Sequence, residues 1–95
     1  MSHYTQPPGA SKVYGLRLTG SGWGADTFLD DVEQTKWSIS PSATLSDRVV
    51  DGKLCTVRVT GLTLGKVYEL KLEYMTAGGH GSSRIITIRC DWVKV

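Results

Sequence analysis

The sequence predicts an all-β protein, a single antiparallel sandwich of short strands. Several segments alternate apolar and polar residues with a period of two, which is the pattern of a strand with one buried face. Turns rich in Gly and Ser separate these segments without convincing helices between them, and two half-apolar sheets must then cover each other. The length of 95 residues suits one small domain and is too short for two cores.

The clearest strand is expected at residues 67–74, "VYELKLEY", where the large apolar residues occupy one face and the charged residues the other. Residues 53–60, "KLCTVRVT", and residues 84–92, "RIITIRCDW", alternate in the same way and are rich in β-branched residues. The side chains predicted to face inward from these three segments are Tyr68, Leu70, Leu72, Tyr74, Cys55, Val57, Val59, Ile86, Ile88, Cys90 and Trp92.

Two earlier segments, residues 12–20 and 32–40, also alternate, and residues 45–50 do so more weakly. About six strands are therefore expected. The inward side chains of the two earlier segments are Tyr14, Leu16, Leu18, Thr35, Trp37 and Ile39, with Trp37 in the core. Residues 26–36 have a second interpretation, because Phe28, Leu29 and Val32 also fit one face of a helix, so strand and helix both stay open there.

A turn before the clearest strand predicts a tyrosine corner. Gly61 ends one strand, Leu62 is expected in the core, and Gly65 allows the chain to turn. Tyr68 then begins the next strand, where its hydroxyl can hydrogen-bond back to the corner that the chain has just passed. Tyr68 is predicted to be structural, whether it forms this corner or only packs its ring.

Residues 1–11, "MSHYTQPPGAS", are expected to form an extended N-terminal arm, with the sandwich domain at residues 12–95. Pro7, Pro8 and Gly9 disfavour regular structure. The arm either docks on a partner, through Tyr4, Pro7 and Pro8, or packs along its own sandwich.

Further candidate partner contacts lie elsewhere in the chain. Trp23 lies between glycines and is either an anchor for a partner or a lid over one end of the sandwich. His80 occupies a Gly-rich hairpin. Val93 and Val95 lie opposite Trp92, so the last strand has apolar residues on both faces, which suits cover by a neighbour or a second subunit.

Composition and motifs argue against several function classes. The net charge is only +2 and no basic block occurs, so nucleic-acid binding is not indicated. No apolar run approaches the ~20 residues of a membrane helix, and the first residues lack the pattern of a signal peptide.

The sequence also carries no signature of catalysis. The acids Asp26, Asp30 and Asp31 do not have the spacing of a calcium loop, and the two histidines, His3 and His80, lack ligand partners. No catalytic, metal-binding or cofactor-binding residue is therefore predicted.

The segment "VRVTGLTLGKVYELKLEYMTAGGHGSS" resembles the second half of a fibronectin type III domain, although Leu64 stands where a Pro is usual. A longer stretch, from "ADTFLDD" to "SSRIITIRC", resembles small virion proteins of tailed bacteriophages. Its shared features are an Asp-Thr dipeptide, a strand ending in a Ser-Pro turn, a Gly-Leu turn with a following Tyr, and a Gly-containing hairpin. In the last of these, His80 stands where an Arg is expected.

The resemblance implies an immunoglobulin-like, non-enzymatic virion protein that decorates the capsid or links a fibre to the tail. Its partners would be major capsid, tail or fibre proteins, with homo-oligomers through strand edges, and it would be made in the bacterial host cytoplasm. Cys55 and Cys90 both face inward, as a disulfide or as two thiols, and a cytoplasmic origin favours thiols. The alternatives are a fibronectin-like module of a bacterial surface or secreted protein, and a small phage inhibitor of a host protein.

Overall fold

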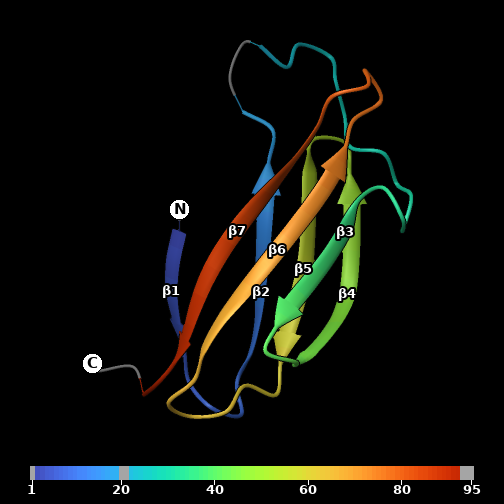
Figure 1. Ribbon diagram of the computed structural model, residues 1–95. Coiled ribbons are helices and arrows are strands. Elements are labelled where there is room, and N and C mark those ends of the chain that lie inside the picture. The colour runs from blue at the N-terminus through green and yellow to red at the C-terminus, as the bar shows by residue number, and fades with distance from the viewer. Residues whose placement is uncertain (1, 20–21, 93–95) are drawn as a thin grey trace.

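The computed structural model describes residues 2–19 and 22–92, and none of these residues is helical. Its strands are β1 (Ser2–Gln6), β2 (Ser11–Arg17), β3 (Lys36–Ser40), β4 (Thr44–Asp51), β5 (Leu54–Thr60), β6 (Val67–Met75) and β7 (Gly81–Cys90). They form a four-stranded sheet in the order β1-β7-β6-β3 and a three-stranded sheet in the order β2-β5-β4. The two sheets face each other (Figure 1), so the predicted all-β sandwich architecture is confirmed.

The first strand, β1, was not expected. It lies within the segment predicted as an extended arm, and it pairs with β7 in parallel, with Ser2 opposite Ile86 and Gln6 opposite Cys90. The other strand pairs are antiparallel. Residues 2–6 therefore lie along the chain's own sandwich, because β7 offers them an edge that is distant in sequence.

The core consists of the alternating faces of the strands. The predicted inward residues of β5, β6 and β7 are buried, and Leu70, Leu72 and Ile88 have no exposed surface. Fully burying one such side chain stabilises the fold by about 1.5–3 kcal/mol. The prediction for Trp92 was wrong: β7 ends at Cys90, and the Trp92 side chain is 64% exposed.

Both cysteines are free thiols within this core. Cys55 and Cys90 have no exposed surface. Burial raises the pKa of each thiol. Of the two alternatives left open by the sequence, the structure therefore has two reduced thiols and no disulfide between Cys55 and Cys90.

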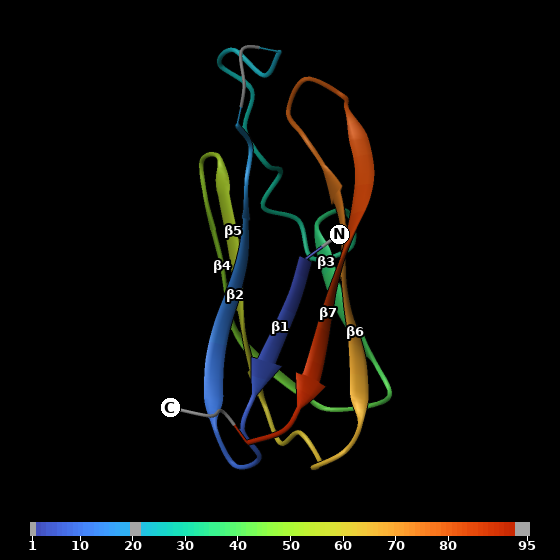
Figure 2. The ribbon, with the colours of Figure 1, turned by 90° about the vertical axis from the view of Figure 1, so that its left-hand side faces the viewer.

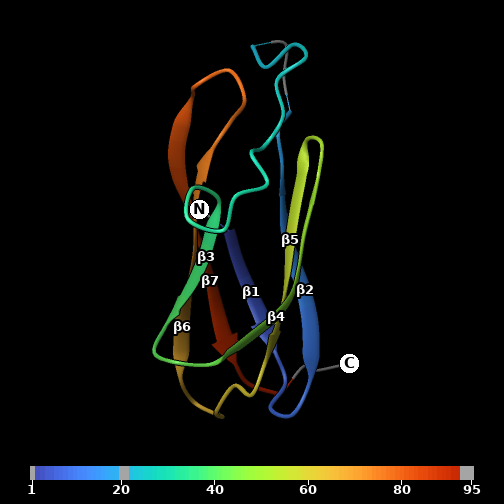
Figure 3. The ribbon, with the colours of Figure 1, turned by 90° about the vertical axis from the view of Figure 1, so that its right-hand side faces the viewer.

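Of residues 26–36, for which the sequence allowed a helix or a strand, residues 26–35 form neither, and the strand β3 begins only at Lys36. The Phe28 N–H donates to the Gly52 carbonyl and the Leu29 N–H to the Met75 carbonyl, both at 2.9 Å. These backbone groups bond across to both sheets, so they do not form the local bonds of a helix. Figure 3 shows this loop descending between the two sheets before it enters β3.

The tyrosine corner is present at the start of β6. The Thr63 N–H donates to the Tyr68 hydroxyl at 2.9 Å, and the Tyr68 ring is buried. Leu62 is buried as expected. Gly65 adopts a φ of 86°, which an L side chain rarely adopts, and its N–H donates to the Cys90 carbonyl at 2.9 Å.

A carboxylate holds the hairpin between β6 and β7. Asp26 Oδ1 accepts hydrogen bonds from the Gly78 N–H at 2.8 Å and the Thr27 N–H at 3.0 Å. The nearby Thr76 hydroxyl lowers the pKa of the Asp26 carboxyl, and these two backbone N–H groups lower it further. Asp26 Oδ2 is shielded from solvent and lacks a partner at hydrogen-bond distance among the described residues, so the Thr76 hydroxyl acts on the carboxylate as a nearby dipole.

Candidate binding site at the open edge of the sandwich

The candidate site lies where the strand β7 is only half covered. On one side β6 pairs with β7 from Gly81 to Arg89. On the other side β1 pairs only with Ile86 to Cys90. Within the described part of the chain, residues 81–85 of β7 therefore have no strand on that side, and Figure 2 shows β1 beside the lower half of β7 alone.

The lower half of this edge is closed by a buried amide. Gln6, at the end of β1, has no exposed surface. Its Nε2 donates to the carbonyls of Val59 and Ala10 at 3.0 and 3.1 Å, and its Oε1 accepts from the Tyr14 hydroxyl at 2.8 Å. Val59 lies in β5 and Tyr14 in β2, so this side chain joins β1 to the opposite sheet.

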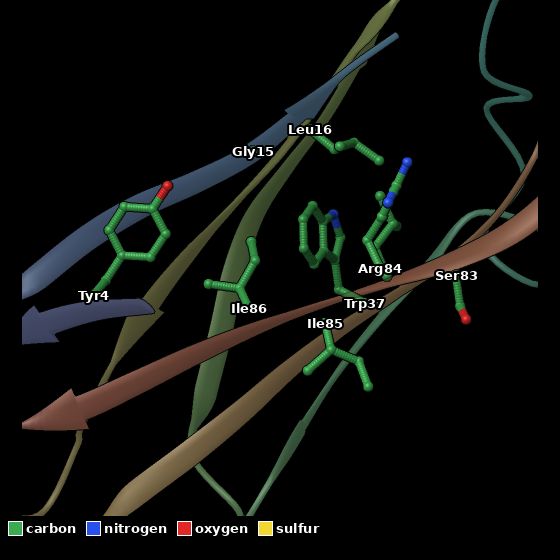
Figure 4. A pocket seen from close by; sticks show the side chains of 9 residues that line it. Tyr4, Gly15, Leu16, Trp37, Ser83, Arg84, Ile85 and Ile86 are labelled. Carbon is green, nitrogen blue, oxygen red and sulfur yellow. The ribbon is translucent and has the colours of Figure 1, made fainter. Parts of the chain in front are cut away.

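The upper half of the edge opens into a cavity of about 480 Å³, called here the edge cavity. Its wall includes Tyr4, Leu16, Trp37, Leu72, Arg84 and Ile86. Figure 4 shows Arg84 and Ile86 on the side of β7 that faces β2, whereas Ile85 points away. This is the alternation of a strand, so Arg84 occupies an inward position where the sheets are not closed.

Trp37 contributes an unsatisfied polar group to this wall. The side chain comes from β3, is 9% exposed, and lies opposite Leu72 of β6. Its indole Nε1–H has no hydrogen-bond partner in residues 2–19 and 22–92. The indole N–H lowers the pKa of the Cys55 thiol, against the larger rise from burial, but the thiol is not a hydrogen-bond partner of Nε1 in the described structure. A buried donor without an acceptor is uncommon in a folded protein and costs about 1–3 kcal/mol.

Arg84 contributes an unpaired cation. Arg48 and Arg58 lie 2.8 and 3.0 Å from the carboxylates of Asp30 and Asp47. By contrast, among the described residues no carboxylate or hydrogen-bond acceptor contacts the Arg84 guanidinium. Arg84 also borders a smaller neighbouring cavity of about 120 Å³, which reaches Leu18 and Trp23.

The predicted contact residues lie in separate places. Tyr4 is 43% exposed at one end of the edge cavity; its ring contacts Tyr14 edge-on at a centroid distance of 5.4 Å, and the Lys12 ammonium lies 5.6 Å from the Tyr4 ring centroid. Pro7 and Pro8 are half-buried in the turn between β1 and β2.

Trp23 and His80 meet at the end of the sandwich where the β6–β7 hairpin turns, with ring centroids 6.3 Å apart. Trp23 is half-buried and also packs against Tyr74, at 6.5 Å between centroids. His80 is exposed, and within the described residues its ring contact is with Trp23 and not with Tyr4, Pro7 or Pro8. Val93 and Val95 lie outside the described residues, and a partner-binding role for all of these residues stays a prediction.

Sequence reasoning missed Arg84 as a site residue and assigned Trp37 to the core alone. One signal was available, because Arg84 precedes Ile86 by two residues and so shares its inward face. The unsatisfied indole N–H carries no such signal, since its partners depend on residues distant in sequence.

The acids considered as metal ligands have separate partners. Asp26 binds backbone N–H groups of the hairpin, Asp30 pairs with Arg48, and Asp31 Oδ1 accepts from the Glu33 N–H at 2.8 Å. In the residues that the structure describes, no three potential ligand side chains come together as a metal site. Nor does that part of the chain contain a helix able to cross a membrane.

In comparisons with known proteins, no family model matches the chain, and no curated protein matches it significantly.

Proposed function

We propose that the protein is a non-enzymatic structural component of a tailed-phage virion, which binds the capsid surface or links a fibre to the tail. The sequence resemblance supports the virion assignment. The half-open edge of β7 supports the mode of action, which is binding by contact with another protein.

The same proposal includes an immunoglobulin-like type for the sandwich. Two features support it: the four-plus-three division of the strands, and the hydrogen bond from the Thr63 N–H to the Tyr68 hydroxyl. The parallel pairing of β1 with β7 is compatible with this type.

One observation carries the binding mode. Residues 81–85 of β7 present one row of backbone N–H and C=O groups that no described strand pairs. An exposed row of this kind is a template for an added strand, and strand addition is a recurring way in which β proteins bind extended segments of partners. The partner would be a phage capsid, tail or fibre protein, or a second copy of this chain.

Co-sedimentation tests the function. The purified protein is mixed with phage capsids and, separately, with isolated tails, each from particles that lack it. Saturable binding to capsids is expected for a decoration protein and saturable binding to tails for an adaptor. Binding to neither at concentrations well above those of an assembling virion would overturn the proposal and favour a secreted module or an inhibitor.

A further inference from the structure

We propose that the edge cavity is a binding site for an acidic extended peptide, which adds as a strand to residues 81–85 of β7 and places one Asp or Glu carboxylate beside Arg84 and the Trp37 indole N–H. This inference rests on the proposed binding by strand addition and specifies the chemistry of the partner. It does not depend on whether the partner is a capsid or a tail protein.

The backbone determines the length and the alternation of the peptide. The unpaired part of β7 spans residues 81–85, so a peptide of about five residues can pair with it. Side chains of neighbouring strands that lie opposite each other point to the same face of the sheet. The peptide residue beside Arg84 would therefore point into the edge cavity, and its two neighbours would point away.

The polar groups of the cavity determine which side chain fits there. Arg84 supplies a guanidinium, Trp37 supplies a buried N–H, and Tyr4 supplies a hydroxyl; none of the three groups has a partner among the described residues. No Asp or Glu borders the edge cavity or the smaller cavity next to it. A site with unpaired donors and a positive charge is complementary to a carboxylate, which only accepts hydrogen bonds.

The apolar part of the wall favours a carboxylate on a peptide over a small free anion. Leu16, Leu72 and Ile86 line the same cavity. They can cover the methylene groups of a Glu side chain, and this burial adds to the affinity. A small inorganic anion would leave this apolar wall in contact with water.

The test uses two synthetic peptides with blocked ends. In the first, a Val and a Glu face inward, opposite Ser82 and Arg84, and Thr residues face outward; in the second, Gln replaces the Glu. Each peptide is titrated into the full-length, isotope-labelled protein and followed by NMR. The Trp37 indole N–H resonance reports directly on the site, and the indole resonances of Trp23 and Trp92 serve as internal references.

The glutamate peptide is expected to shift the Trp37 indole resonance and the amides of residues 81–85, with an affinity about tenfold above that of the glutamine peptide. Arg84→Gln should remove this preference. Arg84 and Arg89 are both exposed, but Arg89 lies beside Asp91 and does not border the edge cavity, so Arg89→Gln should retain the preference. Equal binding of the two peptides, an unchanged preference in Arg84→Gln, or no binding at millimolar concentration would each overturn the inference.

Co-sedimentation with the Arg84→Gln variant separates this inference from the proposed function. If the variant binds virion parts as well as the wild type does, and the peptides do not bind, the acidic-peptide site is wrong and the virion function stands. If the glutamate peptide binds as expected but neither capsids nor tails do, the site stands and the virion function is wrong.

Discussion

The Oε1 atom of Gln6 accepts a hydrogen bond of 2.8 Å from the Tyr14 hydroxyl, and the bond connects the two sheets of the sandwich where their edges meet. The two Nε2 hydrogens of the same amide bind the carbonyls of Val59 and Ala10. A fully buried amide whose donors are satisfied adds specificity, because another register of β1 would leave these groups unpaired.

Replacing Gln6 with Ala should therefore destabilise the protein strongly. The change removes a donor from the carbonyls of Val59 and Ala10 and the acceptor of the Tyr14 hydroxyl, and it opens a cavity, so we expect a loss of about 2–4 kcal/mol in the free energy of unfolding. Urea denaturation measures this loss. The matched control is Thr5→Ala on the exposed face of β1, where a change within about 0.5 kcal/mol is expected. Equal losses in the two variants would contradict a special role for Gln6.

The Tyr14 hydroxyl should make stability fall at alkaline pH. Burial, with a smaller effect from Tyr4, raises the pKa of Tyr14 from 10.0 to about 12. The unfolded chain therefore releases this proton at a lower pH than the folded protein does, so the contribution is intact below about pH 10 and is lost as the pH rises toward 12.

Between roughly pH 9 and pH 11, we expect the wild type to lose about 1 kcal/mol more stability than Tyr14→Phe does. Urea denaturation of both proteins across this range gives the comparison. Parallel pH profiles for the two proteins would show that Tyr14 ionises alike in the folded and unfolded states.

Removing the hydroxyl of the tyrosine corner should weaken the fold without changing its shape. Tyr68→Phe leaves the Thr63 N–H without its acceptor, and we expect a loss of about 1–2 kcal/mol in the free energy of unfolding. Tyr4→Phe is the matched control, because the exposed Tyr4 hydroxyl has no hydrogen-bond partner among the described residues. A loss in Tyr68→Phe no larger than that in Tyr4→Phe would argue against the corner as a stabilising feature.

The two thiols should be unreactive in the folded protein. Neither Cys55 nor Cys90 has exposed surface, and burial raises both pKa values, so little reactive thiolate exists at neutral pH. A thiol-specific reagent should react slowly with the native protein. In concentrated guanidinium without reductant, it should react with both cysteines. Fast reaction of the native protein would contradict the burial, and no reaction after denaturation would reveal a disulfide.

Much of the fold could be predicted from local patterns. The alternation in "VYELKLEY" identified the buried face of β6, and the Gly65 turn before it identified the tyrosine corner. The prediction failed where a segment takes its partners from far along the chain. The sequence "SHYTQ" of β1 places Gln6 inward, and a polar inward residue gives no apolar alternation to detect.

The candidate site was less accessible to prediction than the fold. The sequence shows that Arg84 shares a strand face with the buried Ile86, because the two are two residues apart. It does not show that Arg84 has no carboxylate partner among the described residues. The position of Trp37 in the core was predictable, whereas its unsatisfied indole N–H depends on what the opposite sheet places beside it.

The sequence by itself determined which side chains of β5 and β6 face the core, because the two-residue period of a strand is a local property of the backbone. Only the tertiary structure decided which strand edges are covered. The pairing of Ser2 with Ile86 brings together segments far apart in the sequence, and because β1 begins there, the first five residues of β7, 81–85, have no partner strand on that side in the described structure. Such long-range pairing depends on how the two sheets close together, so the open edge with Arg84 and Trp37 arises from the fold as a whole.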